Sequence, residues 1–233
     1  MLLLIGLLLD GFALPLDLAV RKAALAEALA EVPQRGMVER EEWKLEQPAW
    51  ADAVDKAVCA LEACDPSRGD WMVDPSLLQS WRLVFTSSAT FRRNGGLSAY
   101  ALYVEGVETP ELLMHVAGSR LAQGQLLFEE PLDAASAALV ARSLRLPADE
   151  ASPDAVRIEC RWEAARDDSL SVTAKKIVVG SRDWAPRVSQ NDEVDFDQDK
   201  AVRVLGATKP TFLDRELLVL RALNGAVFVL RSF

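Results

Sequence analysis

The C-terminal segment 212–231 contains the pattern of a complete β-hairpin, and this pattern constrains the fold more than any other in the chain. Two apolar runs rich in branched and aromatic residues flank Asn224 and Gly225. An Asn-Gly pair supplies the positive φ angles that a tight turn between twisted strands requires. The segment therefore predicts two paired antiparallel strands that close a sheet at the end of the chain.

A second segment, 80–88, predicts a strand far upstream of the hairpin. Alternation along it places Trp81, Leu83 and Phe85 on one face. Apolar runs between polar or glycine-bearing breaks predict further strands. Several short antiparallel strands favour a mainly β fold, a closed up-and-down barrel, because closure removes exposed strand edges. The additional strands are expected at 100–107, 111–116, 125–128, 157–163, 171–179, 217–221 and 226–231.

Helical spacing predicts two α-helices before the first strand. The first begins near Leu16, with Asp17 as its N-cap, and ends at Pro33. The second covers about 47–63, and a third, rich in Ala and Leu, is predicted near 132–146. We therefore expect an apolar N-terminal segment (1–15), a helical cap (16–70) and a barrel that carries the helical insertion (71–233).

The apolar N-terminal segment is short. The run from Met1 to Leu9 is far below the ~20 residues of a bilayer-spanning helix, and it lacks the basic residues that begin a secretory signal. It also lacks the Ser- and Arg-rich composition of a plastid transit peptide. We interpret segment 1–15 as a remnant of a targeting sequence or an artefact of the gene prediction. A weak hydrophobic signal core, typical of a lumenal or secreted protein, is the alternative.

The charge balance argues against nucleic acid as a partner. The chain has 35 acidic and 26 basic residues, a net charge of −9 and no run of Lys or Arg. Phosphate binding needs clustered positive charge. Anionic membranes would repel the average surface, so lipid contact is expected to be hydrophobic or local. Cys59, Cys64 and Cys160 have no metal-ligand spacing and leave one thiol unpaired in any disulfide scheme, which favours a reducing compartment.

Candidate catalytic groups are few. His115 is the single histidine, and no Gly-x-Ser-x-Gly motif supplies a nucleophile for it, so we expect an ordinary strand residue. Asp195, Asp197 and Asp199 alternate as in a calcium loop, but the required glycine and final glutamate are absent, which indicates a solvated acidic loop. No cluster of His, Cys and acidic residues has metal-ligand spacing. We therefore predict no catalytic residue, no metal site and no cofactor.

Two motifs resemble a known family. The segment Trp81-Arg82-Leu83-Val84-Phe85-Thr86-Ser87-Ser88 is similar to the W-R-L-L-Y-T-S-S strand of the plastid lipid-associated proteins, also called fibrillins. The C-terminal hairpin is similar to their Y-L-D-E-x-L-R-I-x-R-G…G-x-x-F-V-L pattern, and 61–66 resembles their L-E-A-x-N-P helix end. Leu218 and Leu220 depart from the family. We expect them on the outer face, against lipid, membrane or the N-terminal helices.

The resemblance implies a lipocalin-like β-barrel at the plastoglobules or thylakoids of the plastid. Its implied role is non-enzymatic binding or stabilisation of prenylquinones, carotenoids or acyl lipids, with a plastid enzyme as a further partner. Arg221 is expected to stack over Trp81 and close the barrel floor. An apolar cavity binds by removing ligand surface from water. By alternation and size, the expected cavity residues are Trp81, Leu83, Phe85, Tyr103, Phe128, Trp162, Val219 and Phe228.

Two other functions stay open. In the first, the chain is a structural coat of plastid lipid bodies, with a filled barrel and with Leu218 and Leu220 in contact with lipid. In the second, it is an enzyme or an enzyme adaptor that acts on prenyl or acyl substrates. A cavity with convergent ionisable groups, for instance around His115, would favour the second.

Overall fold

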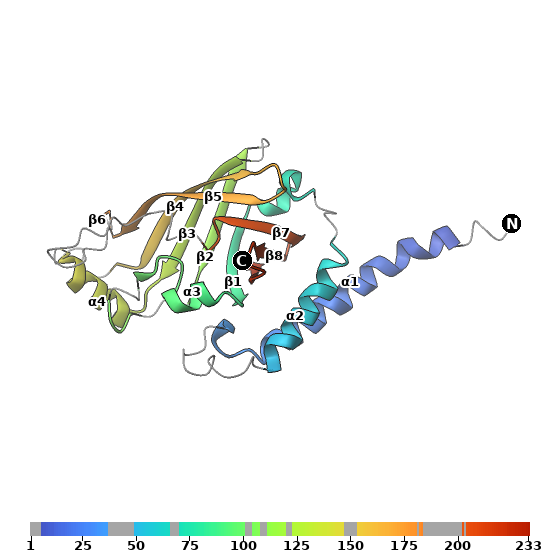
Figure 1. Ribbon diagram of the computed structural model, residues 1–233, viewed down its shortest axis with the longest axis horizontal. Coiled ribbons are helices and arrows are strands. Elements are labelled where there is room, and N and C mark those ends of the chain that lie inside the picture. Colours follow the sequence, from blue (N-terminus) through green and yellow to red (C-terminus); the bar gives the residue numbers. More distant parts are fainter. Residues whose placement is uncertain are drawn as a thin grey trace.

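The computed structural model describes residues 6–36, 49–65, 70–100, 104–107, 111–119, 123–146, 153–180, 182–183, 202 and 204–233. Within these residues, eight antiparallel strands of one sheet form a closed ring, and two long helices lie outside it (Figure 1). The mainly β class and the N-terminal helices are thus confirmed.

The ring has an up-and-down order. Each strand pairs with the next along the chain, and the last strand, β9, pairs with the first, β1, to close the sheet. A ninth, short strand, β6 (Arg182–Asp183), pairs with the far end of β5. The strands of the ring are β1 (Ser80–Thr86), β2 (Leu113–Ser119), β3 (Gln123–Pro131), β4 (Ala155–Ala164), β5 (Leu170–Val179), β7 (Ala207–Leu213), β8 (Leu217–Ala222) and β9 (Val227–Ser232).

The helices follow most of the sequence signals. Helix α4 (Ala134–Leu144) begins at the N-cap Asp133, whose carboxylate accepts a hydrogen bond from the Ser136 amide. Helix α2 (Ala49–Glu62) lies where it was expected, whereas α1 (Gly6–Ala30) begins at Gly6 rather than near Leu16. The short helix α3 (Ala89–Asn94) follows β1, and its N-cap is Ser88.

One strand prediction was wrong, and one strand was missed. In the predicted strand 100–107, residues 104–107 instead form a turn, with φ +81° at Gly106 and a hydrogen bond from the Val104 amide to the Tyr100 carbonyl. Residues 101–103 lie outside the described part of the chain. Strand β7 was not predicted, and it contains Pro210, which lacks an amide proton and is unfavourable inside a strand. A register irregularity between Pro210 and Phe212 accommodates it.

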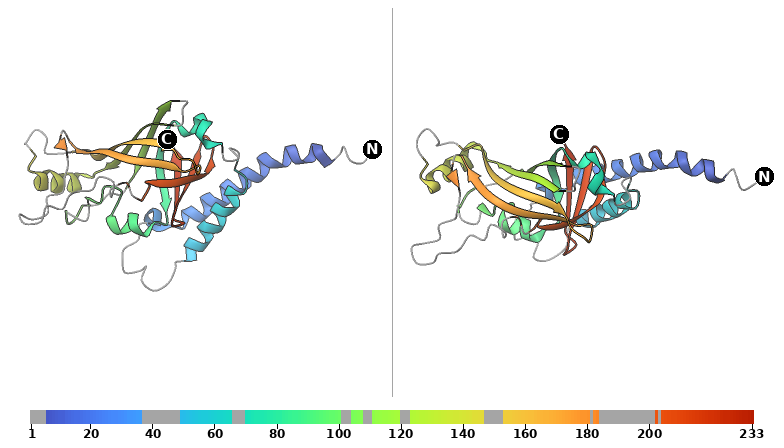
Figure 2. Two further views of the ribbon diagram at one scale, coloured as in Figure 1. Left: turned by 45° about the horizontal axis from the view of Figure 1, so that its top comes forward. Right: turned by 90° about the horizontal axis from the view of Figure 1, so that it is seen from above.

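The sheet separates two hydrophobic clusters. The larger fills the ring, and we call it the interior cluster. The smaller lies between the outer face of β1, β7, β8 and β9 and the helices α1 and α2, and we call it the helix-side cluster. Figure 2 shows both helices beside these strands and α4 at the other end of the molecule. Among the described residues, the helix-side cluster contains Leu25, Val54, Ala57, Val58, Leu61, Phe85, Phe212, Leu217, Val219, Val227 and Val229.

A β-bulge makes β1 contribute to both clusters. Trp81 and Leu83 belong to the interior cluster, but Phe85 belongs to the helix-side cluster. The pairing with β9 shifts register between Leu83 and Phe85, because Val84 is an extra residue on β1. The prediction that Trp81, Leu83 and Phe85 share one face is therefore wrong for Phe85. Its ring meets Trp50 edge-on, with 6.2 Å between the centroids.

Strand β8 faces the opposite way from the prediction. Leu218 and Leu220 are buried in the interior cluster, and Val219 is buried in the helix-side cluster. Two residues of a strand that are neighbours in sequence point to opposite faces, so an error of one residue exchanges the two faces. Leu218 and Leu220 are thus not outer-face contacts for lipid, and Val219 is not an inward residue.

Arg221 ties the ring to helix α2. Its guanidinium donates to the Glu62 carboxylate at 2.6 and 2.9 Å, and the Thr211 hydroxyl donates to the same carboxylate at 2.6 Å. The expected stacking of Arg221 on Trp81 is wrong, because Arg221 shares the outer face with Val219 while Trp81 faces the interior. On the neighbouring β7–β8 turn, Lys22 of α1 pairs with Asp214 at 2.5 Å.

We expect Arg221→Met to lower the free energy of unfolding by about 1–2 kcal/mol, because it leaves the mostly buried Glu62 carboxylate without its cation. Urea denaturation followed by fluorescence measures this loss. The matched control is Arg231→Met, on an exposed position of the adjacent strand β9, where we expect a change within about 0.5 kcal/mol. Equal losses in both variants would contradict a specific role for the Arg221–Glu62 pair.

Candidate functional site

The connections of the ring differ strongly between its two ends. At one end, the segments 165–169 and 214–216 are short turns; we call this the turn end. At the other, the connections 87–112, 132–154 and 180–206 are long, and the β8–β9 turn lies beside them; we call this the loop end. Because long loops on a rigid scaffold commonly carry binding residues, we expect a binding site at the loop end.

Three buried tryptophans close the turn end. Each indole N–H donates to a backbone carbonyl: Trp71 to Asp168 at 3.1 Å, Trp81 to Leu77 at 3.1 Å and Trp162 to Ala117 at 3.0 Å. Glycines on β2 and β3 make room for Trp162, since a Cβ on Gly124 would lie 2.9 Å from its Nε1. These indole donors are therefore engaged by the protein itself, which is the arrangement of a structural plug.

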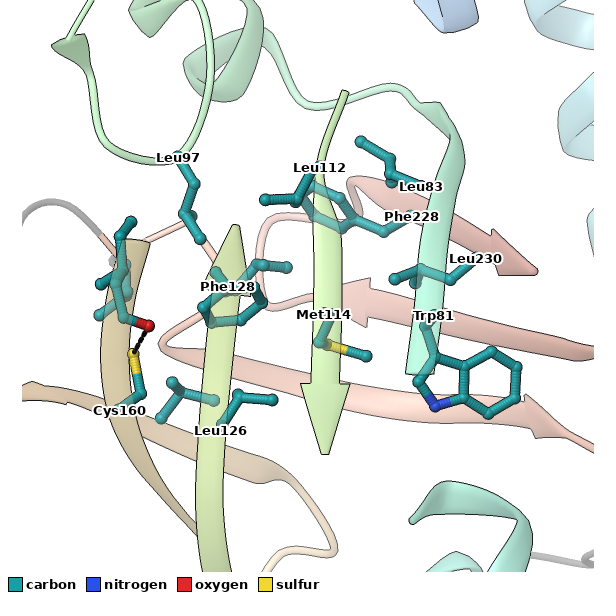
Figure 3. Packing of buried hydrophobic residues seen from close by; sticks show 14 of the residues in the cluster. Trp81, Leu83, Leu97, Leu112, Met114, Leu126, Phe128, Cys160, Phe228 and Leu230 are labelled. Atoms are coloured by element: carbon teal, nitrogen blue, oxygen red, sulfur yellow. Dashed lines mark hydrogen bonds between the residues drawn. The ribbon is translucent and has the colours of Figure 1, made fainter. Parts of the chain in front are cut away.

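The middle of the ring is packed with side chains. Leu83, Phe128 and Phe228 join Trp81 and Trp162 in the interior cluster, and Figure 3 shows the first four of these side chains coming from β1, β3 and β9. The Phe228 ring also meets Phe91 of α3 edge-on, at 6.0 Å between centroids. Five of the predicted cavity residues thus meet in a filled core. Phe85 and Val219 lie in the helix-side cluster, and Tyr103 lies outside the described residues.

A hollow of about 450 Å³ lies at the loop end. Four polar residues from α3, its N-cap and the β8–β9 turn line one part of it. Val204 and Ala222 also pack against the interior cluster, so the hollow leads towards the core. None of the predicted cavity residues lines it, because strand alternation does not place loop residues. The lining residues are Ser88, Thr90, Asn94, Val204, Ala207, Ala222, Leu223 and Asn224.

Thr208 is a functional candidate that the sequence reasoning missed. It is 1% exposed, and its Cα partners in the sheet are Leu170 and Ala222. Directly opposed residues of an antiparallel pair share a face, so Thr208 points into the ring with Leu170. Within the described residues, its Oγ1 has no hydrogen-bond partner. The pattern Ala207-Thr208-Lys209-Pro210 offered no signal for it, since β7 itself was not recognised.

Glu130 places a carboxyl group inside the ring. Its partner across the sheet, Val156, belongs to the interior cluster, and its side chain is fully buried. The carboxylate accepts hydrogen bonds from the amides of Leu97 and Ser98 and so holds the loop that follows α3. Burial raises the pKa of Glu130 to about 7, against the lowering effect of these hydrogen bonds. Alternation from Phe128 was the signal that could have placed this residue inward.

A polar row crosses the outer face of β1 to β4. The Ser80 hydroxyl lies 2.8 Å from His115 Nδ1, His115 Nε2 lies 3.4 Å from Glu129, and Arg157 donates to Glu129 at 2.7 Å. Serine, histidine and an acid thus lie in a row, but the serine is at Nδ1 and the acid at Nε2, the reverse of a Ser-His-Asp triad. The four residues lie on the neighbouring strands β1 to β4. None of them lines either of the two hollows at the surface of the ring.

A second hollow, of about 560 Å³, lies on the outer face and is bordered by exposed Gln125 and Arg161.

Among the described residues, no group of three His, Cys, Asp or Glu side chains could hold a metal ion. Within the same part of the chain, the helices are too short or too polar for one to traverse a bilayer. Burial raises the pKa of the Cys160 thiol to about 12.

No protein-family model matches the chain. No curated protein matches it either.

We expect the free energy of unfolding to fall as pH rises from about 4.5 to about 7, because the unfolded chain loses the Glu130 proton at lower pH than the folded chain does. Below that window the contribution of Glu130 is fully present. Denaturation of the wild type and Glu130→Gln across this range measures it: the difference between the two should depend on pH. The control, Glu163→Gln on the exposed face of β4, should leave the slope unchanged. Parallel curves for wild type and Glu130→Gln would contradict the assignment.

Proposed function

We propose that the chain binds a small, largely apolar molecule at the loop end of the ring, without catalysing a reaction. The observation that carries this proposal is the hollow of about 450 Å³ that leads onto the apolar core at Val204 and Ala222. Small-molecule sites commonly have about 300–1,000 Å³ and combine apolar walls with a few polar groups. Here the polar groups are Ser88, Thr90, Asn94 and Asn224.

Within this proposal, the ring is a lipocalin-like β-barrel and the chain is a plastid lipid-associated protein. The two motifs that carry the resemblance support this: the segment at Trp81 and the C-terminal hairpin are neighbours, paired as β1 and β9. The ligand is then a prenylquinone, a carotenoid or an acyl lipid, and the site of action is the plastoglobule or thylakoid surface in the plastid.

The packed interior moves the expected binding position. Because aromatic and aliphatic side chains fill the middle of the ring, the ligand is expected at the mouth rather than beside Phe128 or Trp162. Burial of about 200 Å² of apolar ligand surface contributes about 5 kcal/mol before the cost of association is subtracted. The polar rim then orients the polar end of the ligand.

A lipid-body coat is the second candidate, and the filled interior favours it. Leu218 and Leu220 do not provide its lipid contact, since both are buried. Exposed apolar side chains elsewhere would have to do so. Those in the described residues are Val20, Val73, Leu78, Leu223 and Phe233.

We expect Ala222→Phe to weaken ligand binding at least about tenfold, because the larger side chain fills the hollow. The probes are a fluorescent C16 acyl chain and a short-chain prenylquinone, titrated by fluorescence. The matched control is Ala164→Phe, a partly buried alanine against the interior cluster at the turn end, which should bind within about twofold of wild type. Thermal melting shows whether both variants fold.

The wild type decides between the two candidates. Binding of either probe with one site per chain supports the proposed function. A wild type that binds neither probe but floats with neutral-lipid droplets would overturn it in favour of the coat. Equal weakening by Ala222→Phe and Ala164→Phe, with both folded, would contradict the position of the site.

A further inference from the structure

The side-chain oxygen of Thr208 makes no hydrogen bond to any residue that the structure describes. Its hydroxyl is buried, faces the ring interior and lacks a hydrogen-bond partner among the described residues. A buried polar group without a partner costs about 1–3 kcal/mol. Valine has nearly the same shape and would avoid this cost, so the fold alone gives no reason for a hydroxyl at this position.

The hydroxyl lies beside the loop-end hollow. Ala222, directly opposite Thr208 on β8, lines the hollow, and so does Ala207, its neighbour in sequence. Opposed residues of an antiparallel pair have Cα atoms about 5 Å apart. Because Ala222 shares the inner face with Thr208 and has only a methyl side chain, no long side chain from this position stands between the hollow and Thr208.

Two of the four polar residues that line the hollow are committed to the backbone. The Ser88 hydroxyl accepts from the Phe91 amide at 3.2 Å and caps α3. The Asn224 side-chain oxygen accepts from the Ala226 amide at 3.1 Å and forms the β8–β9 turn. Thr208 does not line the hollow itself but lies next to it, buried on the inner face of the ring, and its hydroxyl has no partner among the described residues.

A buried hydroxyl is a suitable hydrogen-bond partner for some ligand groups and not for others. An O–H group donates well to a carbonyl oxygen. A single hydroxyl does not compensate the desolvation of a carboxylate at such a depth. A hydrocarbon offers no acceptor at all. The matching group is thus a neutral carbonyl on an apolar body, such as that of a quinone, a ketone or an ester.

We propose that Thr208 Oγ1 donates a hydrogen bond to a neutral carbonyl oxygen of the molecule held in the loop-end hollow, and so selects carbonyl-bearing ligands over hydrocarbons. This inference rests on the proposed binding function and adds the chemical class of the ligand. Ala222 provides the access, and Ser88 and Asn224 keep their structural roles.

The test compares two probes with the same alkyl tail: 2-decyl-1,4-benzoquinone, which has neutral carbonyls, and decylbenzene, which has none. Each displaces the fluorescent acyl probe from wild type, Thr208→Val and Thr208→Ser. We expect wild type to prefer the quinone by about tenfold, as one satisfied buried hydrogen bond allows. Thr208→Ser should keep the preference, and Thr208→Val should abolish it.

The outcomes separate the two proposals. If wild type binds neither probe, the proposed function fails. If it binds both equally, or if Thr208→Val keeps the preference, binding stands and the role of Thr208 is wrong. The melting temperature of ligand-free protein is the second measurement. Thr208→Val should not lower it, because the hydroxyl has no internal partner to lose, and a clear drop would overturn the inference by showing a structural role.

Discussion

The pairing of β1 with β9 is the contact on which the rest of the structure depends. It closes the ring, and the bulge at Val84 within it turns β1 from the interior to the helix side. Trp81 and Leu83 therefore pack inside, while Phe85 anchors the cluster beneath α1 and α2. Ring closure and attachment of the helices are consequences of one strand pairing, so neither hydrophobic cluster is complete without it.

Periodicity and turn chemistry were sufficient to predict the mainly β class, the C-terminal hairpin and helix α4, because these features depend on local sequence. Both signals failed where one extra or one unusual residue decides which face a side chain takes or whether a strand forms. The bulge at Val84 reversed Phe85, a one-residue error in face reversed Leu218 and Val219, and Pro210 concealed β7. The candidate site was harder still to predict, since its residues come from three separate segments that only the closed ring brings together.

Two polar side chains inside the ring differ in how the protein uses them. Tryptophan side chains seal the turn end with each indole donor occupied, Glu130 lies near the end of β3, and Thr208 lies opposite Leu170 and Ala222. Glu130 is used by the protein, because it holds the loop at Leu97 and Ser98. Thr208 is not used by any described residue. This contrast distinguishes a group that organises the mouth of the ring from one that is available to a ligand.

The helices at the start of the chain are held by residues at its end. Lys22 pairs with Asp214, and Glu62 pairs with Arg221, while the buried faces of α1 and α2 rest on β8 and β9. On the ribosome, the helices therefore leave the exit tunnel long before their partners are made. Their apolar faces stay uncovered until β8 and β9 have left the tunnel as well, and contacts of such sequence separation make folding slow.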